Sequence, residues 1–241
     1  MRKTLILLAG LAAAPVAAPV AVEPVTAAET AAETATGTAA EASTGTAEAL
    51  FATGLLDGMA PGTRLIFAHE RAGDFPEEAL AKVEGGVVEI EPVAVGDGPR
   101  TARLELTGAR GTPTVAELPL ASGHPLLILF LENTARNMAE LTRGNPAYIR
   151  NRMREALGGG GTAAPVELAG MYGPTTQFSF RPFETDPNRA RMGAFADLEL
   201  RFVLGDAVPG RFAVLTTQTG PGADGTPAYL ETMRFDHVEE D

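Results

Sequence analysis

The sequence predicts an α+β domain, in which a curved antiparallel β-sheet of about eight strands in two meanders has a central two-helix insertion packed on one face. Two groups of segments alternate apolar and polar residues with the period of a strand, and the stretch between them repeats apolar residues with helical spacing. Turn-forming glycine and proline, 27 and 18 of the 241 residues, separate these segments. Because neither a helix pair nor a sheet buries its apolar face alone, the two are expected to pack together.

Residues 1–22 have the pattern of a secretory signal peptide. Basic residues at the start precede the apolar segment Leu5 to Leu11, and small residues suited to cleavage follow. The alternative is an uncleaved membrane anchor, but Pro15, Pro19 and the weakly hydrophobic alanines disfavour it. We therefore predict export to the bacterial periplasm, with no stable transmembrane span after the signal peptide is cleaved.

Residues 23–49 form an Ala/Thr/Glu-rich segment with almost no large apolar side chain. Ordering such a segment costs backbone entropy with little burial in return, so we predict a disordered linker. Residues 50–241 are then a single α+β domain, long enough to bury its own core. The chain contains no cysteine, which excludes a disulfide and a lipid-modified cysteine and leaves the core to hold the fold.

The first group of predicted strands precedes the helices. In Thr63 to Gly73, the side chains of Leu65, Phe67 and His69 alternate with those of the opposite face. Three further segments continue the group: Gly86 to Val95, residues 100–108 and Thr114 to Leu120. The Gly-Asp-Gly-Pro sequence at 96–99 predicts a turn, so these segments are expected to form antiparallel strands joined by hairpins.

The stretch from His124 to Leu157 predicts two helices. Pro125 suits a first helical turn, and apolar residues recur along one face of the first helix, namely Leu127, Leu131, Ala135, Met138 and Leu141. Gly144 is expected to stop this helix, and Asn145-Pro146 to cap and begin the second. Leu126 to Leu131 is apolar on all sides, which indicates that the first helix begins deep in the protein.

The second group of predicted strands follows the helices. Its segments are Thr176 to Glu184, residues 193–205, residues 211–219 and residues 228–238. In the second of them, one apolar face is expected to consist of Ala196, Leu198, Leu200, Phe202 and Leu204. Short turns rich in glycine and proline separate the segments, so this group is predicted to be a second meander.

The sequence has no pattern that predicts catalytic, cofactor-binding or metal-ligating residues. Ser122 lacks a nucleophile-elbow sequence and suits the turn that precedes a helix at His124. The histidines lack the paired spacing of metal ligands. His69 would meet Asp236 and His237 only if the first and last strands were neighbours, and we interpret all three as surface strand positions.

One cluster of side chains predicts a binding site. Tyr148, Arg150, Arg152 and Arg154 lie on the second predicted helix of a chain whose net charge is −12. Arg150 and Arg154 share one face at i,i+4 spacing, and Tyr148 and Arg152 share another. The cluster is a candidate contact for an anion or a protein partner. The alternative is that carboxylates inside the fold compensate the arginines, with Glu132, Glu140 and Glu155 as candidates.

Two functional hypotheses follow. The first is a non-enzymatic exported protein that binds an apolar small molecule or an envelope protein partner, because the predicted strand faces are apolar and no catalytic set is present. The second is a hydrolase with a carboxylate site built from Asp186, Asp197 or Glu199. The acidic balance and the predicted export disfavour nucleic acid as a partner. The oligomeric state stays open at the level of sequence.

Overall fold

The computed structural model describes residues 45–93, 100–108, 114–170, 173–222 and 225–240. The predicted signal peptide 1–22, the predicted linker up to residue 44 and the predicted turn 96–99 lie outside the described residues. Residues 45–50 form a short helix in which Thr46 and Leu50 are buried. This helix overlaps the end of the predicted linker, so ordered structure begins before residue 50.

The described residues contain one antiparallel sheet of nine strands in the order β4-β3-β2-β1-β9-β8-β7-β6-β5. The strands are β1 Thr63–Ala72, β2 Val83–Val93, β3 Thr101–Thr107, β4 Thr114–Pro119, β5 Thr162–Val166, β6 Thr175–Phe180, β7 Glu199–Gly205, β8 Phe212–Gln218 and β9 Leu230–Glu240. The prediction of two antiparallel meanders is confirmed, with one strand more than the expected number of about eight. The additional strand is β5, an exposed edge strand whose alanines and Pro165 carry little strand signal in the sequence.

Two helices connect the meanders, as predicted. They are α2, Pro125–Thr142, and α3, Pro146–Gly158, and short 3-10 turns occupy Leu120–Ser122, Arg189–Arg191 and Gly193–Asp197. His124 Nδ1 accepts a hydrogen bond from the Leu126 N–H at 3.2 Å and caps α2. Asn145 caps α3 by accepting from the backbone N–H groups of its first turn. Helix α2 ends slightly before the expected Gly144, because Arg143 itself adopts the left-handed conformation of the cap at φ 54°.

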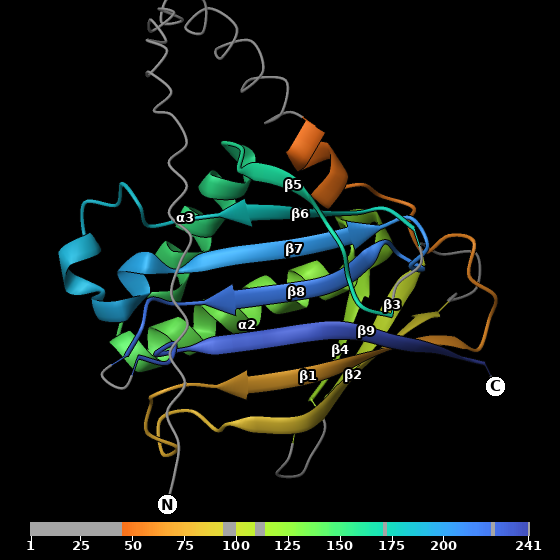
Figure 1. The fold of residues 1–241 in the computed structure, drawn as a ribbon. Helices are drawn as coiled ribbons and strands as arrows, with labels where there is room; N and C mark the ends of the chain where they lie inside the picture. Colours follow the sequence, from red (N-terminus) through yellow and green to blue (C-terminus); the bar gives the residue numbers. More distant parts are fainter. Residues whose placement is uncertain (1–44, 94–99, 109–113, 171–172, 223–224, 241) are drawn as a thin grey trace, which may run out of the picture.

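The sheet curves around α2 (Figure 1), so that β3 and β4 lie behind the helix while β6 to β9 cross in front of it. The first half of α2 fills the space inside this curve. Leu126, Leu127 and Phe130 have at most 1% of their surface accessible, and the Phe130 ring packs edge-on against Phe202 of β7 with centroids 6.1 Å apart. Side chains with so little accessible surface border almost no space large enough for a water molecule. The prediction that the first helix begins deep in the protein is therefore confirmed, and the inner apolar face is filled.

The first and last strands are neighbours. Strand β1 pairs with β9 along its full length, from Thr63 opposite Glu240 to Ala72 opposite Leu230. This pairing joins the two meanders into one sheet. It also corrects the interpretation of His69, which is buried at 1% exposure, whereas the His237 side chain is exposed and lies 3.1 Å from Asp236 Oδ2.

Besides the additional strand β5, the second meander departs from the prediction at the start of β7. Strand β7 begins at Glu199, whereas the alternation suggested a strand from residue 193. Residues Gly193–Asp197 form a 3-10 turn that buries Phe195 instead.

Among the described residues, no helix combines the length and the apolar character that a membrane-crossing helix needs.

Candidate functional site

The predicted cluster on α3 is engaged with carboxylates of the same chain. The Tyr148 hydroxyl lies 2.8 Å from Asp186 Oδ2, and Arg152 Nε donates to the same oxygen at 2.8 Å. A second nitrogen of Arg152, NH1, donates to Glu155 Oε2 at 2.6 Å. The i,i+4 spacing of Tyr148 and Arg152 turns both toward the loop that carries Asp186, where the carboxylate is fully buried. The structure therefore places half of the predicted cluster around one internal anion.

Asp186 is held as a charged group. Burial acts to raise the pKa of its carboxyl, but the Asn188 N–H, the Tyr148 hydroxyl and the Arg152 guanidinium stabilise the anion, and the net result is a lowered pKa. The Asn188 side chain also donates to the Tyr148 hydroxyl at 2.9 Å. A carboxylate with this many donors has little remaining basicity for proton transfer.

The other two arginines of the predicted cluster differ from each other. Arg150 makes a two-point contact with Glu132 of α2, with nitrogen–oxygen distances of 2.7 and 2.9 Å. This contact comes first among the causes that lower the Glu132 pKa. Arg154 is exposed and contacts Asn151 at 3.2 Å. The alternative of compensation inside the fold thus has partners in Glu132 and Glu155, and it adds Asp186, which the sequence did not connect with the arginines.

The carboxylates of the hydrolase hypothesis each have an arginine partner. Asp197 is 62% exposed and paired with Arg189. Glu199 Oε2 lies 2.9 Å from Arg201 Nε. Asp186 is likewise paired with Arg152, so each of the three carboxylates is neutralised locally by an arginine of the same chain.

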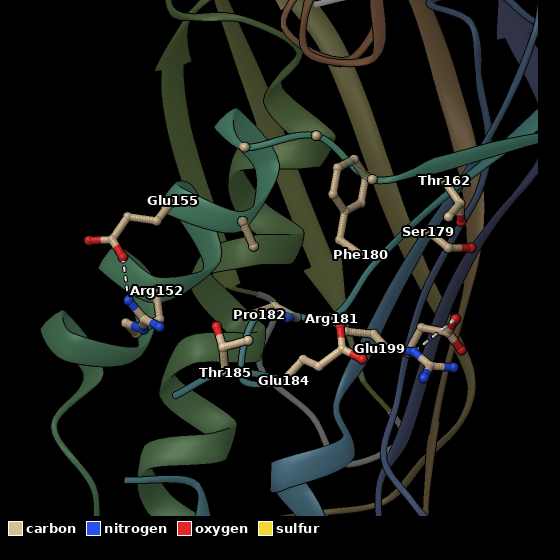
Figure 2. A pocket seen from close by; sticks show the side chains of 14 residues that line it. Arg152, Glu155, Thr162, Ser179, Phe180, Arg181, Pro182, Glu184, Thr185 and Glu199 are labelled. Atoms are coloured by element: carbon tan, nitrogen blue, oxygen red, sulfur yellow. Dashed lines mark hydrogen bonds and ion pairs between the residues drawn. The ribbon is translucent and has the colours of Figure 1, made fainter. Parts of the chain in front are cut away.

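A polar groove lies beside the predicted cluster, between α3 and the ends of β6 and β7. Its first part is a cavity of about 630 Å³ (Figure 2), with Arg152 and Glu155 of α3 on one side and Arg181, Glu184 and Glu199 on the other. Its second part is a cavity of about 360 Å³ that shares the last three of these residues. We call the two cavities together the α3–β6 groove. Its volume is in the range of ligand-binding clefts, and its lining combines charged side chains of both signs with glycine, small polar and apolar residues.

Close backbone packing forms one wall of the groove. Gly161 enters β5 so near to β6 that an added Cβ would lie 2.3 Å from the Ser179 carbonyl oxygen and 2.7 Å from the Phe180 ring. Only glycine permits that approach, which brings the turn after α3 against the strand. The sequence showed the glycine run 158–161 but not the strand against which it packs.

A second polar cluster, missed in the sequence, is buried beneath α2. Glu231 Oε1 accepts from His69 Nε2 at 2.8 Å and from Arg71 NH2 at 2.9 Å. Its Oε2 accepts from the Tyr229 hydroxyl and from Asn137 Nδ2, the latter at 3.3 Å. Both oxygens are thus saturated, and the Glu231 side chain has no accessible surface. This arrangement suits a structural link between the helix and the sheet, because it leaves no free lone pair for chemistry.

The electrostatics of this buried cluster agree with a structural role. Burial acts to raise the pKa of Glu231, but the hydrogen bond from His69 and the charge of Arg71 outweigh it and lower the pKa to about 2. Burial next to this carboxylate raises the pKa of Tyr229 well above its ordinary value. In the sequence, this cluster was indicated only by polar residues at inward-facing positions of two strands. Hydrophobic alternation does not show which strands are neighbours, so it could not bring these residues together.

The remaining candidates do not converge. His124 lies at the start of α2, where burial lowers its pKa to about 3, and it stacks on Phe212 with centroids 4.7 Å apart. Ser122 lies in the preceding 3-10 turn. Within the part of the chain that the structure describes, no group of three or more metal-ligating side chains is placed to hold an ion.

Comparison with known families finds no family that matches this chain, and comparison with curated proteins finds no match. Among solved structures, the chain is similar to one described as a crystal structure of MucB, with 10% sequence identity and a TM-score of 0.37. The similarity covers 85% of this chain and 59% of the MucB chain, so this chain spans about three fifths of that protein's length.

Proposed function

We propose that this protein is an exported, non-enzymatic binding protein of the cell envelope, and that it contacts a protein partner through the α3–β6 groove. The observation that carries the proposal is the contrast between the two faces of the molecule. The inner apolar face is filled by α2, whereas the two cavities of the α3–β6 groove are accessible and include charged side chains of both signs in their linings. Polar, partly charged surfaces of this kind resemble the rim of protein–protein contacts more than a lipid-binding pocket.

The same contrast separates the two ligand classes of the binding hypothesis. An apolar small molecule needs an apolar cavity, and the side chains that would line one, Leu127 and Phe130 among them, have at most 1% of their surface accessible. A protein partner needs only an accessible surface. The proposal therefore favours the envelope protein partner over the apolar ligand.

The alternative hydrolase is supported less well. General acid–base catalysis by carboxyl groups requires one carboxyl with a raised pKa beside one that stays ionised. Asp186 has a lowered pKa, and Asp197 and Glu199 are paired with arginines. These contacts support recognition by the groove better than acid–base catalysis by these three carboxylates.

The proposal is tested by site-specific photocrosslinking in cells that express the full chain. A photoreactive residue at Thr185, an exposed position in the groove, is expected to give a discrete crosslinked protein in the periplasmic fraction. The matched control is Val115, which is 50% exposed on β4 at the opposite edge of the sheet and is expected to give none. The partner identified by mass spectrometry is then crosslinked in the reverse direction. Equal products from both positions, or recovery of the protein only from the cytoplasm, would contradict the proposal.

A further inference from the structure

We propose that the α3–β6 groove recognises a polypeptide segment that carries one acidic and one basic side chain close together. The inference deepens the proposed function and rests on it for the biological partner, but the peptide chemistry is tested separately. The charged side chains of the groove differ in whether they already have partners inside the protein.

Most charged side chains of the groove are neutralised inside the protein. Arg152 holds Asp186 and Glu155, and Arg189 pairs with Asp197. Glu199 is engaged at 2.9 Å by an arginine of its own strand, Arg201. A new ligand would have to displace these contacts, so these residues contribute shape more than attraction.

Arg181 and Glu184 are different. Both are exposed and line both cavities of the groove. The ion pair of Arg181 is with Glu199, at the long distance of 4.0 Å and with 62% of the arginine side chain accessible. Glu184 forms no ion pair within the described part of the chain. One cation and one anion are thus available at the point where the two cavities meet.

The weakly paired Arg181 and the exposed Glu184 belong to one anchored turn. The Glu184 N–H donates to the Arg181 carbonyl oxygen at 3.3 Å, and the two intervening residues, Pro182 and Phe183, are buried. Phe183 has no accessible surface, and Pro182 fixes its own backbone torsion. The charged side chains therefore project from a backbone that is already ordered. Ordering before binding reduces the entropy cost of recognition.

The partner that matches this turn carries charges of both signs. A ligand with two carboxylates would meet Glu184, and one with two cations would meet Arg181, whereas a segment with one of each satisfies both. In an extended segment, side chains two residues apart lie on the same face. Glycine and serine groups at Gly159 to Gly161 and at Ser179 (Figure 2) add hydrogen-bonding groups along the same cavity.

The test measures peptide preference by NMR titration of the isotope-labelled full domain with three blocked peptides. Their sequences are Ala-Glu-Ala-Lys-Ala, Ala-Lys-Ala-Lys-Ala and Ala-Glu-Ala-Glu-Ala. The native protein is expected to bind the Glu/Lys peptide about two- to fivefold more tightly than either like-charged peptide, which is the effect of one exposed ion pair. Shifts should centre on residues 159–162 and 179–185.

Two variants make the test specific. Arg181→Glu should reverse the order in favour of the Lys/Lys peptide, and Glu184→Lys should reverse it in favour of the Glu/Glu peptide. A reversal cannot result from partial unfolding. The matched control is Arg103→Glu, which changes the net charge equally at a 51% exposed position on β3 and should leave the order unchanged.

The outcomes separate the inference from the proposed function. An order that stays the same in all variants, or one that Arg103→Glu changes as much as Arg181→Glu, overturns the peptide inference. If the order of peptide affinities contradicts the inference in this way while a photoreactive residue at Thr185 still crosslinks a partner, the groove binds a protein by other chemistry. If the peptide order reverses as expected but no partner is crosslinked, the recognition chemistry stands and the proposed envelope function falls.

Discussion

His69 Nε2 lies 2.8 Å from Glu231 Oε1, across the pairing of the first and last strands and 162 positions apart in the chain. Around this contact, Arg71 from β1, Tyr229 from the loop just before β9 and Asn137 from α2 converge on the same carboxylate. The buried cluster therefore ties both meanders and the helix to one point.

Replacement of the central carboxylate should destabilise the domain strongly. Glu231→Gln keeps the shape of the side chain but leaves Arg71 buried without its counter-ion, which costs about 3 to 5 kcal/mol. Urea unfolding at neutral pH measures the loss. The control Glu105→Gln, on the outer face of β3, should stay within about 0.5 kcal/mol of the native protein. If Glu231→Gln lowered the free energy of unfolding as little as the control does, the cluster would not be a structural link.

The same residue predicts acid sensitivity. The pKa of Glu231 is lowered from 4.5 to about 2, so its stabilisation is complete above pH 4.5 and is lost as the pH falls toward 2. The contribution is on the order of 3 kcal/mol over this interval. The difference in unfolding free energy between the native protein and Glu231→Gln should therefore shrink in that window. A difference that stays constant down to pH 2.5 would contradict the lowered pKa.

His124 predicts a separate effect at milder pH. Burial lowers its pKa from 6.5 to about 3, so below pH 6.5 the unfolded chain binds a proton that the folded protein does not. Stability should fall by roughly 2 to 3 kcal/mol between pH 6.5 and 4.5 from this residue alone. His124→Asn keeps a side-chain acceptor at the start of α2 and removes the titration. The variant should be less stable than the native protein at neutral pH. Its free energy of unfolding should change less between pH 6.5 and 4.5, as measured by urea midpoints.

Two adjacent residues of α2 test how the inner face is filled. Phe130 has no accessible surface, so Phe130→Ala should cost about 3 to 5 kcal/mol by leaving a cavity against Phe202. Leu131 was expected from the sequence to lie on the inner face, but it is only half-buried. Leu131→Ala should therefore cost clearly less in the same urea experiment. Equal losses would place both side chains in the core.

The α3 cluster provides another matched pair. Arg152→Ala removes the cation that faces the buried Asp186 carboxylate and should cost about 1 to 3 kcal/mol in urea unfolding. Arg154→Ala, on the exposed face of the same helix, should change stability by less than about 0.5 kcal/mol. If the two variants behave alike, the contact of Arg152 with Asp186 contributes nothing to the fold.

The sequence predicted those parts of the fold that depend on local patterns. The helix pair followed from apolar spacing, from Pro125 in the first turn of α2 and from the cap at Asn145, and most strands followed from alternation. Strand β5 was missed because small residues and Pro165 pair there only through the neighbouring β6. Residues 193–198 were predicted as strand because the apolar alternation of β7 happens to continue into the preceding 3-10 turn.

The candidate site was predictable only in part, for a different reason. Tyr148 and Arg152 were found because helical spacing places them together, but their common partner Asp186 lies in a distant loop. The link between His69 and Glu231 depends on which strand pairs with which, and no local pattern carries that information. In the sequence, Arg181 and Glu184 are merely two opposite charges on either side of a Pro-Phe pair. Only the structure shows that both line the groove.

The pairing of β1 with β9 has a consequence for biosynthesis. The sheet is completed only when β9, which follows the other eight strands in the sequence, pairs with β1, so the earlier meander emerges from the ribosome with an unpaired edge and an unfinished core. Contacts this distant in sequence form slowly, because loop closure precedes any gain from them. The domain should therefore remain unfolded until β9 has been synthesised and is free to pair with β1. Chains arrested before β9 should be digested by protease as fast as an unfolded chain, and the full-length chain should resist.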